Sequence, residues 1–351
     1  MIKKINIENK IIGENKPCFI IGEIGSNHNR DKRTVKKLID AAVKAQFDAV
    51  KFQIYDPEEA FSKFVTTTDV NLEHLYGKKE WWKIARDKIL MPRSWFSEMF
   101  EYARKRNIIP FSAVHNKDDA RFLIDLGVGI FKIASIDCNH LPLIRQIAKF
   151  NKPMIFSTGM ARIDEIDSTM KTLAKLGNKK IALLHCVSCY PPRNEIINLN
   201  NIQMLKERYD CIVGFSDHSI SNAFSVAAVG LGARIIEKHI TLNRKTKGPD
   251  HPFALEPKDM IALVESIRSV EKALGRKERI LSTDELAARK MIRRSIVAKA
   301  DIKKSEPITI ENVKFARPGT GISPNDFKNI EGKKARKLIS ADTIIAKEML
   351  R

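Results

Sequence analysis

Eight short apolar segments recur along the first 240 residues, and the stretches between them carry apolar residues at helical spacing. The segments predict strands at 19–25, 49–55, 109–114, 130–135, 153–159, 180–186, 212–217 and 233–240. Their near-continuous apolar character is typical of a parallel sheet that is buried on both faces. Eight consecutive β–α units predict a (β/α)8 TIM barrel rather than an open doubly wound sheet.

The predicted helices have one apolar face each. After the first strand, Val35, Leu38, Ile39, Ala42 and Val43 recur at helical spacing within a lysine-rich stretch, as expected of an outer barrel helix. The last barrel helix is predicted at 257–275. The long segment 56–94, rich in tryptophan, is predicted to be a lid or a subunit contact, because loops of this length in compact domains usually have a function.

The chain is predicted to contain two domains. Residues 1–280 form the barrel domain, in which residues 1–16 are expected to make a hairpin that closes the amino end of the barrel. A linker is predicted at 281–292. Residues 293–351 read as short strands separated by turns, which predicts a small, mostly β domain.

Composition excludes several classes of function. The net charge is +20, and residues 286–351 hold 16 Lys and Arg against 7 Asp and Glu. These basic residues are dispersed, with only Phe315 and Phe327 as aromatic partners, so no nucleic-acid partner is expected. We find neither a membrane span nor a signal peptide, and the five scattered cysteines read as reduced thiols. A cytoplasmic protein without a membrane partner is predicted.

Two histidines end the last two predicted strands. His218 and His239 lie 21 residues apart, and adjacent strands of a sheet are about 4.8 Å apart. The two imidazoles can therefore share a divalent metal, with Asp217 and Glu237 as acidic neighbours. The alternative is that both histidines are satisfied polar residues that close core strands.

Other polar residues follow the remaining strands, and in a TIM barrel these ends form the active site. Positive charges and hydroxyls suited to a phosphate ester come from Lys51, Lys132, Ser135, Ser157 and Ser216. Groups suited to a polyhydroxylated substrate are Glu23, Gln53, Tyr190 and Asp250. Together with a metal they favour carbon–carbon bond chemistry on a carbohydrate. The competing interpretation makes Lys132 the Schiff-base lysine of a barrel aldolase.

Ordered motifs along the whole chain resemble those of the N-acetylneuraminate (sialic acid) synthase family, which includes synthases for legionaminate, pseudaminate and spore-coat sugars. The motifs are GEIGSNHN, AVKFQ, FKIAS, STGM, HCVSCYP, GFSDHS, EKHI and GPDHPFALEP. The segment from Ser295 to Pro324 resembles the C-terminal antifreeze-like (SAF) domain of that family.

The resemblance implies a condensation of phosphoenolpyruvate with an N-acyl aldose such as N-acetylmannosamine, with C–O cleavage that releases phosphate. It implies manganese, with magnesium or cobalt as alternatives, on His218 and His239. Glu23 would act at the reacting carbon. Phosphoenolpyruvate would contact Lys51, Lys132, Ser135, Ser157, Ser188 and Ser216, and the sugar would contact Gln53, Tyr190, Asp250 and Arg317. Arg317 would enter the barrel of a partner subunit in a domain-swapped homodimer.

The chain departs from the family pattern after the third strand. It reads FSAVHN where many relatives read FSTPFD, so that Ala113 replaces a threonine hydroxyl expected near the phosphate. His115 either compensates for that hydroxyl or occupies a loop position, and the loop position is favoured. The sequence leaves the acceptor sugar open among N-acetylmannosamine, its 6-phosphate and a diacetamido-trideoxyhexose. A non-enzymatic sugar- or nucleic-acid-binding protein is the remaining alternative.

Overall fold

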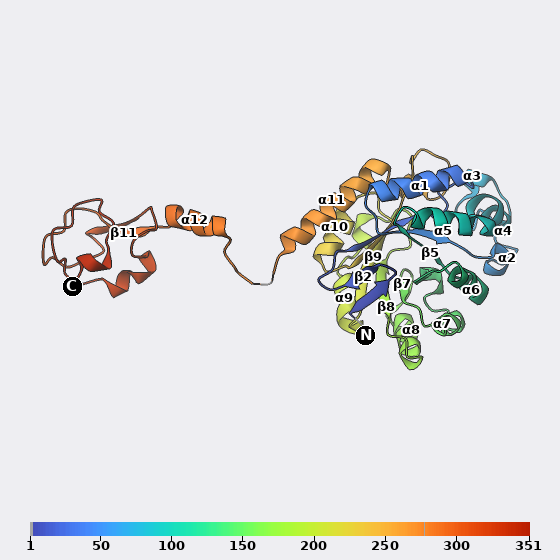
Figure 1. The fold of residues 1–351 in the computed structure, drawn as a ribbon, viewed down its shortest axis with the longest axis horizontal. Helices are drawn as coiled ribbons and strands as arrows, with labels where there is room; N and C mark the ends of the chain where they lie inside the picture. Colours follow the sequence, from blue (N-terminus) through green and yellow to red (C-terminus); the bar gives the residue numbers. More distant parts are fainter. Residues whose placement is uncertain (1–2, 277) are drawn as a thin grey trace. The chain divides into compact units, whose positions relative to one another are not determined.

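The structure is a computed structural model that describes residues 3–276 and 278–351. The chain divides into two compact units, one ending at Gly275 and one beginning at Arg276. The first unit is a closed barrel of eight parallel strands (Figure 1), which confirms the predicted TIM barrel. The strands are β3 (Phe19–Glu23), β4 (Ala49–Gln53), β5 (Ile109–Ala113), β6 (Phe131–Ile133), β7 (Met154–Ser157), β8 (Ile181–Cys186), β9 (Ile212–Asp217) and β10 (Ile235–His239).

Helices cover the outside of the barrel (Figure 1). They are α1 (Lys32–Lys44), α5 (Phe96–Arg104), α6 (Lys117–Asp125), α7 (Leu141–Ala148), α8 (Ile163–Lys175), α9 (Asn201–Tyr209), α10 (Ala223–Gly230) and α11 (Pro257–Leu274). Helix α1 begins after Asp31, whose side chain accepts a hydrogen bond from the Arg33 N–H. It buries Val35, Leu38 and Ile39, as its apolar spacing predicts.

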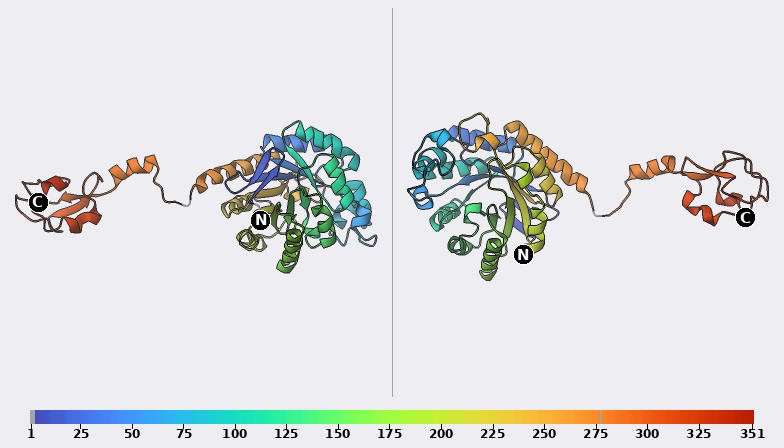
Figure 2. Two further views of the ribbon diagram at one scale, coloured as in Figure 1. Left: turned by 60° about the horizontal axis from the view of Figure 1, so that its bottom comes forward. Right: turned by 180° about the vertical axis from the view of Figure 1, so that it is seen from behind.

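An N-terminal hairpin precedes the barrel. Strands β1 (Lys4–Ile7) and β2 (Lys10–Gly13) pair in antiparallel register, and Ile5, Ile7 and Ile12 are fully buried in the main core. Lys10 forms a 2.9 Å ion pair with Asp48, the residue immediately before β4. The hairpin therefore packs at the amino end of the strands, opposite the end that carries the predicted site (Figure 2).

The segment between β4 and α5 contains five short helices. It forms α2 (Pro57–Ala60), α3 (Glu73–Tyr76), α4 (Trp81–Ile84), the π-helix η1 (Ala85–Ile89) and the 3-10 helix η2 (Arg93–Trp95). Trp81, Ile84, Ala85 and Ile89 make a small apolar cluster of their own. Phe61 packs against Trp81 of this cluster and against Tyr55, two residues after β4, so the cluster is linked to the end of that strand. Its predicted role as a lid or subunit contact stays a prediction.

The second unit has its own core. Helix α12 (Thr283–Ile292) is followed by the antiparallel pair β11 (Ser295–Ala298) and β12 (Val313–Ala316), by further isolated bridges, and by the 3-10 helices η6 (Pro324–Asn329) and η7 (Lys347–Met349). Ile296, Ile302, Ile308 and Ile345 are fully buried in it. The small, mostly β domain is thus confirmed.

The boundary between the units differs from the predicted one. Gly275, with φ 55°, ends α11, and most of the predicted 281–292 linker is helix α12. Ser282 and Glu285 explain this difference, because they form a capping box at the start of α12.

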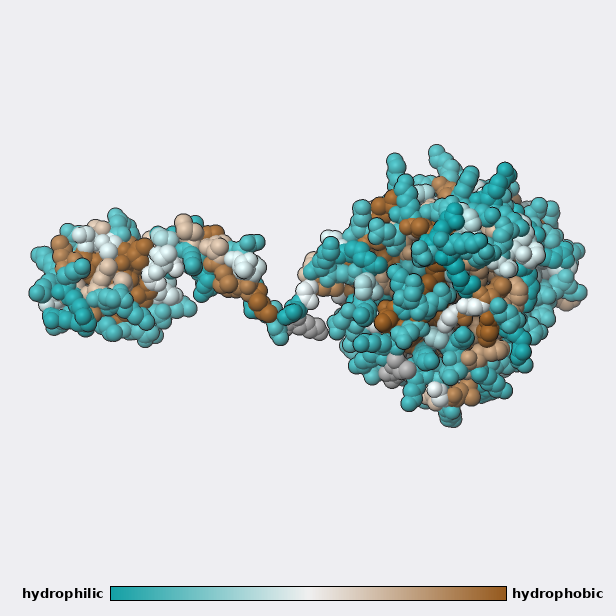
Figure 3. Space-filling view, viewed as in Figure 1, coloured by the Kyte–Doolittle hydropathy of each residue, from teal (hydrophilic) through white to brown (hydrophobic). Residues whose placement is uncertain are grey.

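Hydrophilic residues cover most of the visible surface of the barrel unit (Figure 3). In the second unit, helix α12 exposes the apolar side chains of Leu286, Met291 and Ile292. Among the helices of residues 3–276 and 278–351, none combines the length and apolar character needed to cross a membrane.

Candidate active site

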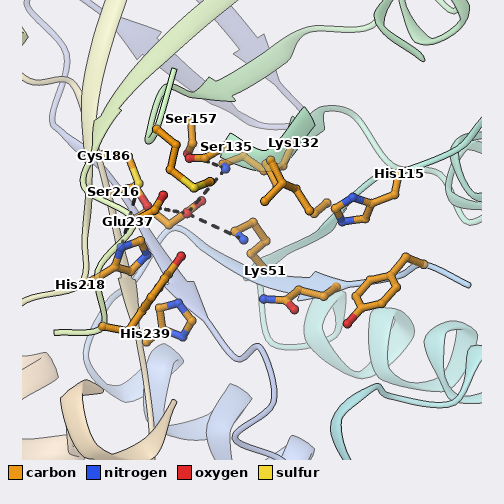
Figure 4. Close-up of a pocket in the computed structure, with 18 of the residues that line it drawn as sticks. Lys51, His115, Lys132, Ser135, Ser157, Cys186, Ser216, His218, Glu237 and His239 are labelled. Carbon is orange, nitrogen blue, oxygen red and sulfur yellow. Dashed lines mark hydrogen bonds and ion pairs between the residues drawn. The ribbon is translucent and has the colours of Figure 1, made fainter. Parts of the chain in front are cut away.

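A cavity of about 250 Å³ opens at the carboxyl ends of the barrel strands (Figure 4). Ten of the predicted site residues line it: Lys51, Gln53, Lys132, Ser135, Ser157, Ser188, Tyr190, Ser216, His218 and His239. They come from six different strands or the loops that follow them. The predicted convergence of these residues on one mouth is therefore present in the structure.

Strand register brings opposite charges together on the floor of this cavity. Glu23 on β3 is the register partner of Lys51 on β4, and Lys51 Nζ lies 2.7 Å from Glu23 Oε2. Gln53 Nε2 donates a 2.7 Å hydrogen bond to Glu23 Oε1. Glu237 Oε1 lies 3.8 Å from both Lys51 Nζ and Lys132 Nζ. Two amines and two carboxylates thus share one buried site.

Burial and these contacts shift the four charged groups in different directions. Burial lowers the pKa of Lys51, but Glu23 and Glu237 outweigh it and raise the pKa above its usual value. Burial dominates for Lys132, whose pKa is lowered, and for Glu23, whose pKa is raised. Burial raises the pKa of Glu237, yet Lys132 and Lys51 together lower it to about 2. Glu237 therefore stays ionised between the two amines.

Hydroxyls and one backbone amide converge beside the lysines. Ser157 Oγ accepts a 2.7 Å hydrogen bond from Lys132 Nζ, and the Gly159 N–H donates to Ser135 Oγ at 3.1 Å. A Cβ atom at Gly159 would lie 2.8 Å from Ser135 Oγ and closer still to Ser188 Oγ. Any larger residue at position 159 would therefore force these two hydroxyls to move.

The Ser188 hydroxyl is buried and has no hydrogen-bond partner among the described residues. Leaving such a group unsatisfied costs about 1–3 kcal/mol. A bound ligand that accepts a hydrogen bond from the Ser188 hydroxyl would remove this cost. The combination of lysines, hydroxyls and an N–H is suited to an anion such as a phosphate.

His218 and His239 face each other across the ends of β9 and β10, with ring centroids 5.4 Å apart (Figure 4). His218 Nδ1 lies 3.0 Å from the Val187 carbonyl oxygen, so its Nε2 is the nitrogen left for a ligand. His239 Nδ1 is buried without a hydrogen-bond partner in the described part of the chain, 3.7 Å from Asp250 Oδ2. Burial lowers the pKa of His239 to about 4, so this ring is neutral at pH 7, as a metal ligand must be.

The histidine pair fits a divalent metal with open positions. Residues 3–276 and 278–351 contain no group of three His, Cys, Asp or Glu that could hold a metal ion. Two imidazoles would thus be the protein ligands, and the remaining positions would belong to water or substrate. Manganese on this pair stays a prediction.

Three predicted residues lie outside the cavity wall. Glu23 is buried against Lys51, at 2.7 Å. Asp250 lies beside His239 and accepts a 2.8 Å hydrogen bond from Ser26 Oγ. Arg317 follows β12 in the second unit, so its contact with the sugar stays a prediction.

The expectation that Asp217 lies beside the histidine pair is wrong. Its side chain pairs with Lys238 at 2.6 Å on the other face of the sheet. Side chains alternate along a strand, so Ser216 faces the cavity and Asp217 faces away from it. The same alternation places Glu237 and His239 in the cavity and turns Lys238 outward.

Several cavity residues were not assigned a role from the sequence. Cys186 lines the wall, and its signal is the inward register that it shares with Ser216, its partner on β9. Glu237, predicted as an acidic neighbour of the histidine pair, lines the wall as well. Tyr55 lies two residues beyond Gln53 and continues its face. The sequence favoured a loop position for His115; it does follow β5 in a loop, and it also lines the cavity.

A closed barrel with polar and charged side chains gathered at the carboxyl ends of its strands has the architecture of a TIM-barrel enzyme. The NeuB family matches residues 38–279, and the SAF domain matches residues 293–351. The chain therefore belongs to the NeuB family and is an enzyme of the sialic acid-type synthase group. Both parts of the predicted resemblance are confirmed.

Relatives cover nearly the whole chain. The N,N'-diacetyllegionaminic acid synthase of Campylobacter jejuni is 38% identical over 333 residues, which are 94% of this chain and 99% of that protein. The human N-acetylneuraminate-9-phosphate synthase is 33% identical over 347 residues, 97% of this chain and 94% of that protein. Among solved structures, the N-acetylneuraminic acid synthetase of Leptospira borgpetersenii matches with 34% sequence identity and a TM-score of 0.72. The match covers 81% of this chain and 94% of that chain.

Proposed function

We propose that this enzyme condenses phosphoenolpyruvate with an N-acyl aldose to give a nine-carbon 2-keto acid and inorganic phosphate. The observation that carries the proposal is the anion site of Lys51, Lys132 and the hydroxyls around Gly159, placed next to the His218–His239 pair. An anionic three-carbon donor and a metal-bound acceptor require such adjacent sites. The names of the relatives support a nine-carbon sugar acid as the product.

The residues of the cavity divide between the two substrates. Lys51 and Lys132 would neutralise the phosphate and carboxylate of phosphoenolpyruvate, with Ser135, Ser157, Ser188 and Ser216 as hydrogen-bond partners. Gln53 and Tyr190 line the cavity, Asp250 lies beside His239, and the three would orient the sugar. Arg317 of a second subunit would contact the acyl group.

The reaction balances without an imine. The C3 carbon of phosphoenolpyruvate forms a bond to the aldehyde carbon, and positive charge develops at C2. Glu23, held by Lys51 and Gln53, would stabilise this charge or direct the water that adds there. Water adds to C2 and releases one proton, which balances the proton that the aldehyde oxygen takes up as it becomes a hydroxyl. The C2–O bond to phosphate then breaks, phosphate leaves with both bonding electrons, and the hydroxyl left on C2 loses its proton to form the ketone.

A divalent metal on His218 and His239, proposed to be manganese, would supply Lewis-acid polarisation of the sugar aldehyde. Asp250 would hold His239 in position from behind, since its carboxylate lies 3.7 Å from the ring. The two histidines thus orient the acceptor over the enol carbon of the donor.

One panel of acceptors tests the function. Phosphate release from phosphoenolpyruvate is measured with manganese and N-acetylmannosamine, its 6-phosphate, or a diacetamido-trideoxyhexose. We expect release with one acceptor and none without a sugar. Absence of release with every acceptor and metal would contradict the proposal.

The lysine-imine alternative has one favourable observation, since burial lowers the pKa of the Lys132 amine. Lys132 Nζ, however, donates to Ser157 Oγ at 2.7 Å and lies near Glu237. Treatment with borohydride and pyruvate separates the two reactions. A covalent adduct on Lys132 would favour the aldolase, and an unmodified lysine is expected for the synthase.

A further inference from the structure

One buried phenylalanine contacts both histidines of the candidate metal site. Phe253 ends the 3-10 helix η5 (His251–Phe253) and is 1% exposed. Its ring centroid lies 5.0 Å from that of His239 and 6.2 Å from that of His218, and the ring planes meet at 67° and 86°. Such edge-to-face arrangements are the ones that aromatic rings prefer. Phe253 therefore packs against both imidazoles.

No hydrogen bond fixes the plane of the His239 ring. Its Nδ1 atom is buried without a hydrogen-bond partner in the described part of the chain, and the 3.7 Å to Asp250 Oδ2 is longer than a hydrogen bond. The torsion that turns an imidazole about its Cβ–Cγ bond has broad energy minima. Rotamer preference alone therefore does not set the plane of this ring, and packing against Phe253 restrains it.

The backbone next to Phe253 is tied to the strand that carries His239. The Leu255 N–H donates to the His239 carbonyl oxygen at 2.8 Å, and the Thr241 N–H donates to the Leu255 carbonyl oxygen at 2.8 Å. The His251 side chain is held as well, because its Nδ1 lies 2.7 Å from Thr241 Oγ1. The phenylalanine is thus kept at a defined place beside the end of β10.

Phe253 also contacts Tyr190, at a ring-centroid distance of 5.5 Å. Tyr190 lines the cavity and is 56% exposed, and its ring centroid lies 4.3 Å from that of His218. The rings of Tyr190, His218, His239 and Phe253 therefore form one aromatic cluster. Phe253 is its buried apolar member and contacts the other three rings.

We propose that Phe253 is a positioning residue that sets the ring planes of His218 and His239, so that both imidazoles can bind one divalent metal. The role of the histidine pair as a metal site rests on the proposed function. Phe253 acts only through the two histidines, because a phenyl ring has no atom that serves as a ligand of a divalent metal.

The test measures metal binding to the full chain rather than turnover. Manganese is titrated by calorimetry, and cobalt by visible absorption, which reports on the geometry of the cobalt ligands. Phe253→Leu removes the ring and keeps an apolar side chain. We expect about tenfold to hundredfold weaker manganese binding, as is typical when a group that orients a metal ligand is removed. The cobalt absorption should change as well.

Two further variants separate positioning from folding. Phe253→Met also removes the ring but keeps more of the side-chain volume, and it should show the same losses if Phe253→Leu does not fold. Phe100→Leu is the matched control, because Phe100 is also 1% exposed and packs against Phe52 and Phe96 on the α5 side of the barrel. It should lower stability in urea unfolding and leave both metal readouts unchanged.

Three results would contradict the inference. Wild-type manganese affinity with an unchanged cobalt spectrum in Phe253→Leu or Phe253→Met would overturn it and leave the proposed function standing. An equal loss of affinity in Phe100→Leu would also overturn it, since the loss would then follow from general destabilisation of the barrel. A wild type that binds neither manganese nor cobalt would contradict the metal assignment of the proposed function, and the inference with it.

Discussion

Asp217 and Lys238 form a buried ion pair of 2.6 Å on the outer face of β9 and β10, directly beside His218 and His239 in sequence. Lys238 Nζ also donates to the carbonyl oxygens of Ser219 and Ser221. The pair thus joins the two strands and the loop after His218. We infer that it fixes the spacing of the two histidines from behind.

Lys238→Met is expected to destabilise the barrel by about 3–5 kcal/mol, because it leaves the Asp217 carboxylate buried without its cation. All three tryptophans, Trp81, Trp82 and Trp95, lie in the barrel unit, so urea unfolding followed by tryptophan fluorescence reports on that unit alone. Lys206→Met is the control. It removes an exposed ion pair with Glu14, worth at most about 1 kcal/mol. Equal effects of the two substitutions would contradict the structural role of Lys238.

Gly159→Ala should disable the anion site. The added Cβ would lie 2.8 Å from Ser135 Oγ and closer still to Ser188 Oγ, so both hydroxyls would have to move. We expect the KM for phosphoenolpyruvate to rise at least about tenfold, roughly 1.4 kcal/mol, with a smaller change for the sugar. Gly230→Ala on α10 is the matched control, since nothing lies within 4 Å of a Cβ there. A wild-type KM in Gly159→Ala would show that the convergent hydroxyls do not bind the donor.

The histidine pair makes a prediction that needs no turnover. Calorimetric titration with manganese should give one site per chain in the wild type and no measurable site in His218→Ala or His239→Ala. Removal of metal by a chelator should abolish phosphate release, and manganese should restore it. Full phosphate release by His218→Ala would contradict the metal assignment.

Arg317 can be tested by mixing subunits. Arg317→Ala should raise the KM for the sugar more than that for phosphoenolpyruvate, and His218→Ala should be inactive. If Arg317 acts on the partner's barrel, mixed dimers of the two variants contain one intact site and regain activity. Mixtures that stay inactive despite exchanging subunits would contradict the domain-swapped arrangement. Full activity of residues 1–285 alone would contradict it as well.

The barrel could be predicted because its information is local. Eight apolar runs, and helix faces such as that of Val35, Leu38 and Ile39, each specify an element, and the short connections leave few topologies. Because active sites of TIM barrels lie at the carboxyl ends of the strands, the predicted strand ends also locate the active site. This is why ten of the site residues could be named before their distances were known.

The remaining errors came from side-chain direction and from tertiary contacts. Asp217 was misplaced because its neighbours were read as a strand end without applying the alternation that turns every second side chain outward. The place of His115 in the cavity wall could not be predicted, because its partner, Asp137, is 22 residues away in the chain. A single sequence does not contain that contact.

The most direct test of the proposed condensation follows the bridging oxygen of phosphoenolpyruvate. The donor is labelled with oxygen-18 between C2 and phosphorus and is incubated with manganese and the accepted amino sugar. We predict that all of the label appears in the released phosphate, because the C–O bond breaks. Label retained in the sugar acid would show P–O cleavage and would contradict the proposed function of the Lys51, Lys132 and Glu23 site.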